Sequence, residues 1–246
     1  WGEISLDRTI GIQAIIAFSQ KVLGSSTFSI YVPNIIVSFL MIFFTYELHK
    51  ELIDKIYPRA SSLILATTYL WINYSHQASQ DLIYSFLILF GIFSTIKFIK
   101  TKNNFFLIPI GLWIGLAFML KTYLSILPLF ALTPILIKEK IINKKLFWIG
   151  IIIGFIPFFL WSLLIWNIYG LDNYFGLFDK VIALSSNNTF TNPFYFYFWN
   201  IPVNIFPWTF LSIIGFFISF KNKNNIVRYF LFFYPLIIIF LISFFS

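Results

Sequence analysis

The sequence predicts an all-α protein, a polytopic bundle of transmembrane helices, and three observations support this fold class. Hydrophobic residues make up 59% of the chain and charged residues only 11%, whereas soluble domains average about 45–50% and roughly 25%. The apolar residues fall into eight runs separated by short polar or charged segments. None shows the ten-residue alternation of a membrane β-barrel, and within lipid only helices or closed barrels satisfy their backbone hydrogen bonds.

The eight runs place the expected membrane helices in order along the chain. Several are shorter than the ~20 residues that cross a bilayer without tilt, so we expect their ends to shift by a few residues. The runs cover residues 31–48, 60–75, 82–99, 105–120, 122–137, 146–168, 201–220 and 229–246.

Basic residues predict which helix ends face the cytoplasm. Lys and Arg gather in cytoplasmic loops, and most of the 17 basic residues lie in four of the connections. We therefore expect an external side made of residues 1–30, 76–81, a turn at Lys121 between two spans, and a loop over 169–200. The basic residues assigned to the cytoplasmic side are Lys50, Lys55, Arg59, Lys97, Lys100, Lys102, Lys138, Lys140, Lys144, Lys145, Lys221, Lys223 and Arg228.

Residues 9–24, "TIGIQAIIAFSQKVLG", predict a short external helix that lies in the membrane interface. Its apolar positions recur at helical spacing, with polar side chains between them. Gly24 suits the position after a helix end, and Ser25 or Ser26 suits the N-cap of the next helix.

Two GxxxG patterns, Gly111 to Gly115 and Gly150 to Gly154, lie within apolar runs. Small residues let membrane helices approach closely, so both patterns predict helix packing.

Residues 192–208, "NPFYFYFWNIPVNIFPW", contain an aromatic run bounded by Pro193 and Pro202. Two interpretations stay open, because Trp and Tyr concentrate at the membrane interface anyway. The run is either an interfacial aromatic belt or part of a groove for a lipid substrate.

The stretch "YSHQASQDLIYSF", residues 74–86, places several polar side chains between two apolar runs. We expect His76, Gln77, Gln80 and Asp81 to form a tight external turn. Asp81 would stand near the N-terminus of the following helix, where a carboxylate accepts backbone N–H groups and complements the helix dipole. That structural role is one interpretation, and a functional site is the other.

Three further charged residues on the expected external side favour the functional interpretation. Asp7 and Arg8 precede the interfacial helix, and Lys121 has apolar neighbours on both sides. Lys121 either snorkels to the interface or binds an anion. Together with Arg8 it could hold a phosphate, Arg through its forked guanidinium and Lys as a point charge.

Other chemistries lack the residues they need. The chain has no Cys and only two His, so we expect no metal site and no cofactor. The net charge of +8 comes from short clusters between apolar runs, a distribution typical of topology signals rather than of a nucleic-acid surface.

Four segments, in order, resemble the polyprenyl-phosphate-dependent GT-C glycosyltransferases of the protein O-mannosyltransferase and aminoarabinose transferase type. "LDRTIGIQAIIAFSQKVLG" resembles the family's "KPPL" segment and juxtamembrane helix, with Arg8 at the Lys and Asp7 at an acidic position. "HQASQD" resembles "R.ATTD", which puts His76 on the Arg and Asp81 on the Asp. "GLWIGLAFMLKTYLSILPLFAL" resembles "GL.LGLAFLTKGP.A.LLPL", which puts Lys121 on the motif Lys and Thr122 on its Gly. "NPFYFYFWNIPVNIFPWTF" resembles "PF.YYL…L.PW".

The resemblance implies an inverting transfer of a sugar from a polyprenyl-phosphate donor to an external protein, lipid A-like glycolipid or other lipid. We accordingly expect Arg8 and Lys121 to hold the donor phosphate, with His76 as a weaker helper. Asp81 would orient the site or pair with a cation, and Asp7 is a secondary catalytic candidate. The main catalytic carboxylate is expected upstream of residue 1. The enzyme would lie in a plasma membrane, such as a bacterial inner membrane, with its site on the external or periplasmic face and a role in cell-envelope glycosylation.

We expect residues 1–246 to form one transmembrane domain that lacks a first helix and catalytic loop upstream and a C-terminal part downstream. Two alternatives stay open. A transporter or flippase would place ionisable residues near the bilayer midplane, whereas here they stand at the ends of the runs. The second alternative is an inactive assembly subunit of the same fold.

Overall fold

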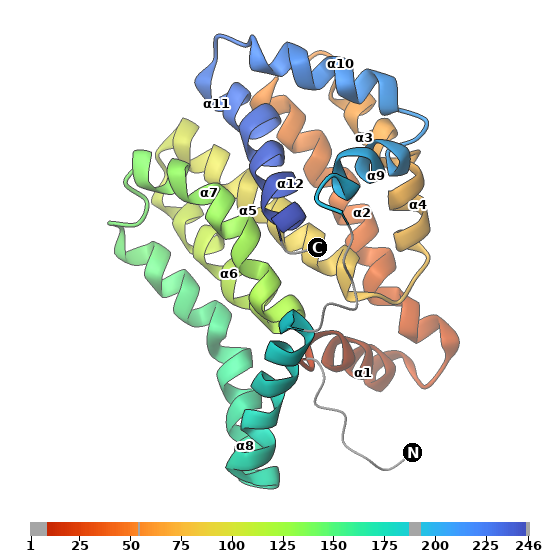
Figure 1. The fold of residues 1–246 in the computed structure, drawn as a ribbon, viewed down its shortest axis with the longest axis vertical. Coiled ribbons are helices and arrows are strands. Elements are labelled where there is room, and N and C mark those ends of the chain that lie inside the picture. Colours follow the sequence, from red (N-terminus) through yellow and green to blue (C-terminus); the bar gives the residue numbers. More distant parts are fainter. Residues whose placement is uncertain (1–8, 54, 187–192, 245–246) are drawn as a thin grey trace.

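The computed structural model describes residues 9–53, 55–186 and 193–244, and within these ranges every regular element is a helix (Figure 1). The all-α polytopic bundle expected from the sequence is confirmed. Its α-helices are α1 Gly11–Leu23, α2 Thr27–Leu52, α3 Pro58–Ala66, α4 Tyr69–Ser75, α5 Gln80–Thr101, α6 Leu107–Lys121, α7 Ile126–Lys138, α8 Lys145–Ser186, α9 Phe196–Asn204, α10 Thr209–Phe220, α11 Asn225–Arg228 and α12 Tyr234–Phe244. Short 3₁₀ turns cover Asn104–Phe106 and Thr122–Ser125, and a π-helical turn covers Tyr229–Phe233.

Five helices of the described chain are long and apolar enough to cross a membrane, or six when the bent pair α9 and α10 counts as one span. The expectation of about eight is therefore too high. The run 60–75 is split into α3 and α4, and the run 122–137 forms only the short helix α7. The expected loop 169–200 also differs, because α8 continues to Ser186 beyond a break at Gly170.

The centre of the bundle is α6, which packs between α5 and α8. Buried side chains from α5, α6 and α7 form one core, including Ile96, Trp113, Ala117 and Leu132. Helices α2 and α12 complete it from the side, α2 against α5 and α12 against α7 (Figure 1).

The two GxxxG patterns meet face to face between α6 and α8. A Cβ on Gly115 would lie 2.3 Å from the carbonyl carbon of Gly154, and one on Gly111 would lie 2.1 Å from the backbone oxygen of Phe147. Only hydrogen at these positions allows so close an approach of two backbones. The predicted packing role of both patterns is confirmed.

Helix α1 crosses the end of the bundle where α6 terminates (Figure 1). It ends before Gly24, and the next helix is capped by Ser26, whose side chain accepts a hydrogen bond from the Ser29 backbone N–H. The Ser29 side chain in turn accepts from the N–H of Ser26, which completes a reciprocal capping box. The predicted helix and its boundary residues are confirmed.

The break between α3 and α4 has a local and a tertiary cause. Thr67 and Thr68 each donate their hydroxyl to the carbonyl four residues earlier, at 2.6 and 2.7 Å, a pattern that bends helices. The N–H of Tyr69 then donates to the carbonyl of Phe206 at 2.9 Å, outside its own helix. The Trp208 indole N–H also donates to the hydroxyl of Thr67 at 2.8 Å, so the segment between α9 and α10 holds this break open.

Charged residues that the sequence predicts to lie on opposite sides of the membrane lie at opposite ends of α5. At its C-terminal end Lys97 lies 2.6 Å and Lys100 lies 3.6 Å from carboxylate oxygens of Glu51. Asp81 lies in its first turn. A helix of this length spans roughly 30 Å, which separates the two sets by about the thickness of a hydrocarbon core.

Candidate active site

The turn that carries the polar stretch is anchored by a buried amide. Asn34, in α2 and 1% exposed, donates its side-chain N–H groups to the carbonyls of Gln77 at 2.6 Å and Ser79 at 3.0 Å. These bonds satisfy two carbonyls just before α5 begins. Hydrogen bonds from α2, and not the local sequence alone, thus fix the conformation of the turn.

Asp81 lies in the first turn of α5, as the sequence predicts. The N-cap is Ser79, whose hydroxyl accepts a hydrogen bond from the Asp81 backbone N–H at 3.3 Å. The Asp81 carboxylate therefore does not have to cap the helix, although its charge complements the dipole there. Its side chain is 42% exposed and available for a second contact.

That second contact is Lys121, whose ammonium forms an ion pair with the Asp81 carboxylate. Lys121 is the last residue of α6, and its side chain is 20% exposed. The structure thus joins two residues that lie forty positions apart in the chain. An ammonium has three N–H donors, so Lys121 can bind an additional anion while it remains paired.

The backbone after Lys121 takes an unusual conformation. Thr122 has φ 45° and ψ −121°, a region that favours glycine and that β-branched residues avoid. The following turn is held by Ser125, which donates its hydroxyl to the carbonyl of Thr122 at 2.6 Å, and by Tyr84, which donates to the carbonyl of Leu124 at 2.9 Å. This turn directs α7 away from the end of α6.

The other predicted site residues are placed differently. His76, an exposed residue, bonds through Nδ1 to the carbonyl of Ile72 at 2.7 Å, so that nitrogen must carry the proton. Its ring stays with the end of α4, and no hydrogen bond links it to Asp81 or Lys121 within the described part of the chain. Asp7 and Arg8 lie outside the described residues. The nearby Gly11 packs so tightly on α6 that a Cβ would lie 2.5 Å from the carbonyl oxygen of Met119.

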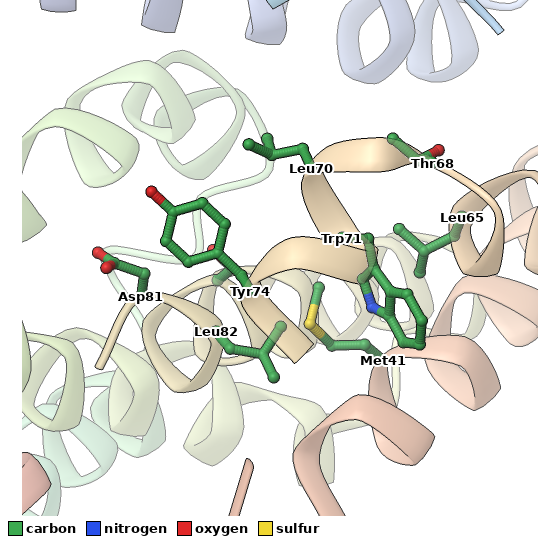
Figure 2. Close-up of a pocket in the computed structure, with 9 residues that line it drawn as sticks. Met41, Leu65, Thr68, Leu70, Trp71, Tyr74, Asp81 and Leu82 are labelled. Atoms are coloured by element: carbon green, nitrogen blue, oxygen red, sulfur yellow. The ribbon is translucent and has the colours of Figure 1, made fainter. Parts of the chain in front are cut away.

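A pocket of about 330 Å³ opens beside Asp81 (Figure 2). Its walls come from α2, α3, α4 and α5. Its polar lining consists of the Asp81 carboxylate and the aliphatic hydroxyl groups of Thr68 and Ser85, together with the aromatic side chains of Trp71 and Tyr74. The indole N–H of Trp71 is buried and has no hydrogen-bond partner among the described residues. The lining residues are Met41, Leu65, Thr68, Leu70, Trp71, Tyr74, Asp81, Leu82 and Ser85.

No group of three or more His, Asp or Glu side chains in the described ranges is close enough to hold a metal ion. The chemistry that Lys121 and Asp81 offer is electrostatic. A cation at a helix end, a paired carboxylate and an adjacent apolar pocket match an amphipathic ligand that has an anionic head group.

A protein-family model matches residues 7–166, and its description is dolichyl-phosphate-mannose-protein mannosyltransferase. The match covers more than half of the 246 residues. The chain belongs to this mannosyltransferase family. Comparisons with curated proteins and with solved structures gave no match.

Membership of the mannosyltransferase family confirms the resemblance to GT-C glycosyltransferases. It makes the chain an integral, multi-pass membrane glycosyltransferase of a family that uses polyprenyl-phosphate sugar donors. The matched residues include Asp81, Lys121 and every residue that lines the pocket, whereas α9 to α12 lie beyond them.

Sequence reasoning missed two residues of this region, Asn34 and Trp71. Asn34 is a lone amide after Pro33 inside an apolar run, and a buried amide there must find partners, which was a usable signal. Trp71 carries no such signal, because a Trp near a helix end also fits an interfacial belt.

Proposed function

We propose that the protein transfers a sugar from a polyprenyl-phosphate donor to a hydroxyl or phosphate group of an external acceptor, with inversion at the sugar carbon. The observation that carries this proposal is the ion pair between Lys121 and Asp81 at the edge of an apolar pocket. Family membership supports the donor class. The acceptor would be a protein, a lipid A-like glycolipid or another lipid, at the external face of a plasma membrane such as a bacterial inner membrane.

In the proposed reaction an acceptor oxygen attacks the anomeric carbon of the sugar, and the bond from that carbon to the phosphate oxygen breaks. The electron pair stays on the lipid phosphate, and a carboxylate removes the acceptor proton. Lys121 stabilises the charge that develops on the phosphate. Arg8 is proposed as its partner, because Gly11, three residues later, packs beside Met119, two residues before Lys121.

The carboxylates have separate proposed roles. Asp81 orients the Lys121 ammonium, and Asp7 is a secondary candidate for work on the acceptor. His76 contributes only as a weaker helper, because its Nδ1 is already bonded to its own helix.

The test is sugar transfer by the purified full-length protein from a polyprenyl-phosphate sugar to a panel of acceptors. Lys121→Ala and Arg8→Ala should each lower kcat/KM by about a hundredfold, since each removes a charge-assisted contact to the leaving phosphate. Lys138→Ala, an exposed Lys at the far end of α7, is the matched control and should keep full activity. Undiminished transfer by Lys121→Ala would reject the phosphate role of Lys121.

A further inference from the structure

The connection between α7 and α8 carries positive charge that no acid in the described part of the chain neutralises. Residues 139–145, which join the end of α7 to the start of α8, contain one acid and three exposed lysines. The acid, Glu139, pairs with Lys102 of the neighbouring connection at 2.7 Å. None of the three lysines forms an ion pair with a described residue. We call Lys140, Lys144 and Lys145 the lysine cluster, and Figure 1 shows their connection at the edge of the bundle.

The backbone of this connection is held by hydrogen bonds. Ile141 is fully buried in the core, and its N–H donates to the carbonyl of Leu136 at 2.9 Å. The N–H of Lys144 donates to the carbonyl of Ile141 at the same distance of 2.9 Å. The indole N–H of Trp148, in the first turn of α8, donates to the carbonyl of Ile142 at 2.7 Å. These bonds fix the backbone from which the lysine cluster projects.

Helix stability does not explain the two lysines at the start of α8. This helix begins at Lys145 and has no acid in its first turn. The N-terminal end of a helix carries partial positive charge, so bases there are unfavourable. Lys138, by contrast, lies at the C-terminal end of α7, where a base is favourable, and it is not part of the cluster. An anion that binds from outside the protein would offset the repulsion at Lys144 and Lys145.

An apolar face of α8 continues from the lysine cluster. Trp148 follows Lys145 by three residues and is 50% exposed. Exposed isoleucines come next, and their i, i+3, i+4 and i+7 spacing places them on one face of the helix. They are Ile149, Ile152, Ile153 and Ile156. Gly150 and Gly154, on another face, pack onto the backbone of α6. Positive charge, an interfacial ring and a lipid-facing surface therefore follow one another along a helix long enough to span a membrane.

These features match a phospholipid with an anionic head group. Lysine ammonium groups donate charge-assisted hydrogen bonds to phosphate oxygens, and clusters of basic residues beside membrane helices bind acidic lipid head groups. The acyl chains of such a lipid would lie along the isoleucine face. A soluble anion would use only the lysines, whereas a neutral lipid would use only Trp148 and the isoleucines.

We propose that the lysine cluster binds the head group of an anionic phospholipid whose acyl chains lie along the isoleucine face of α8. The start of α8 packs near the start of α6, where a Cβ on Gly111 would lie 2.1 Å from the backbone oxygen of Phe147. The site therefore stands at the opposite end of α6 from Lys121. The inference goes beyond the transfer reaction and does not depend on it. It predicts that the protein selects acidic lipids from a mixed bilayer at this position.

The experiment measures how tightly the purified full-length protein, in one neutral detergent, binds phosphatidylglycerol and phosphatidylcholine with the same dioleoyl chains. Native mass spectrometry follows the bound lipid through a titration. The wild type should bind phosphatidylglycerol about tenfold more tightly than phosphatidylcholine, because lysines next to the head group attract its net negative charge. Equal affinity for the two lipids would overturn the proposal.

A double variant, Lys144→Gln with Lys145→Gln, removes the two charges at the start of α8. It should lower affinity for phosphatidylglycerol by about tenfold and for phosphatidylcholine by less than about twofold. Lys221→Gln with Lys223→Gln is the matched control, because it removes the same charge from the exposed connection between α10 and α11. The control should change affinity for phosphatidylglycerol by less than about threefold. An equal loss in both double variants would reveal attraction by net charge alone and would contradict a site at α8.

Thermal unfolding separates lost binding from lost folding. Without lipid, the double variant at Lys144 and Lys145 should unfold at the wild-type midpoint or above it, since two bases leave the positive end of α8. Added phosphatidylglycerol should raise the midpoint of the wild type more than that of the variant, because a ligand stabilises the folded state that it binds. An equal rise in both proteins would count against the lysine cluster.

A photolabel keeps the inference testable should the double variant fail to fold. Phosphatidylglycerol with a diazirine near the start of one acyl chain should label the wild-type peptide that contains Ile149 and Ile152. Phosphatidylcholine with the same diazirine, at equal concentration, should label that peptide about tenfold less. Equal labelling by the two lipids would show that the face has no preference for acidic lipid and would refute the assignment.

Soluble phosphate and acidic protein segments are the other ligands that a lysine cluster can take. Neither inorganic phosphate nor an oligoglutamate peptide, each in large molar excess, should displace phosphatidylglycerol, because neither has acyl chains for the isoleucine face. Displacement by inorganic phosphate would make this a site for a soluble anion. Displacement by oligoglutamate would make it a docking surface for an acidic protein. Either result would reject the lipid as the ligand.

Discussion

The ammonium of Lys121 contacts the carboxylate of Asp81 and joins the last residue of α6 to the first turn of α5. Each group partly neutralises the other, and both keep some exposure. A phosphate that approaches Lys121 therefore also meets a negative charge. The pair holds the ammonium in place and at the same time limits how strongly it attracts an anion.

Replacing the carboxylate should separate these two effects. Asp81→Asn removes the nearby negative charge, so we expect geranyl phosphate to bind about threefold more tightly, the scale of a partly exposed ion pair. Sugar transfer should nevertheless slow, because the Lys121 side chain loses its orienting partner. Binding and turnover measured on the same preparation check this. A loss of affinity as large as that of Lys121→Ala would contradict it.

The contact between α6 and α8 should tolerate no side chain at its glycines. A methyl group at Gly115 would meet the backbone of Gly154, so Gly115→Ala should lower the free energy of unfolding by about 1–3 kcal/mol through overpacking. Thermal unfolding in detergent measures the change. Gly215→Ala is the matched control, since in the described part of the chain no atom beyond its own helix backbone lies within 4 Å of that Cβ position in α10. It should be neutral or stabilising by up to about 1 kcal/mol.

Replacing Thr122 with glycine should stabilise the protein, because glycine suits the backbone conformation at that position. With φ at 45°, Thr122→Gly removes strain and should raise the free energy of unfolding by about 1 kcal/mol. Thr133→Gly, within helix α7, is the control and should lower stability by about 0.5–1 kcal/mol. Equal destabilisation by both changes would show that the Thr122 conformation is not strained. The measurement is again the unfolding midpoint.

The amide of Asn34 should be needed to hold the start of α5. Asn34→Ala leaves the carbonyls of Gln77 and Ser79 without their donors, and each lost hydrogen bond should cost about 0.5–1.5 kcal/mol. Amide hydrogen exchange across residues 76–84 should become faster. Asn143→Ala removes an exposed amide in the loop between α7 and α8 and should leave exchange across residues 76–84 unchanged. Slow exchange in Asn34→Ala would mean that Ser79 alone fixes the turn.

Local patterns allowed part of the site to be predicted. Asp81 lies in the first turn of α5 and Ser26 caps α2, as expected, because capping depends on residues within one turn of each other. The sequence also placed Lys121 at a helix end. It could not show that Lys121 and Asp81 form a pair, since that contact depends on how α5 and α6 pack.

The sequence by itself determined the membrane-embedded, all-helical class, the small-residue faces of α6 and α8 and the segregation of charge to the helix ends. The class and the charge segregation follow from the cost of exposing polar backbone or charge to lipid, which acts on each segment separately. The small-residue faces are visible as a local spacing of glycines. The tertiary structure decided which segment holds the break between α3 and α4 open, how Asn34 anchors the 76–79 turn and where the pocket beside Asp81 lies. Each of these depends on a partner far away in the chain, such as the Phe206 carbonyl that accepts the N–H of Tyr69. A local pattern of apolar residues does not specify such a contact between distant parts of the chain.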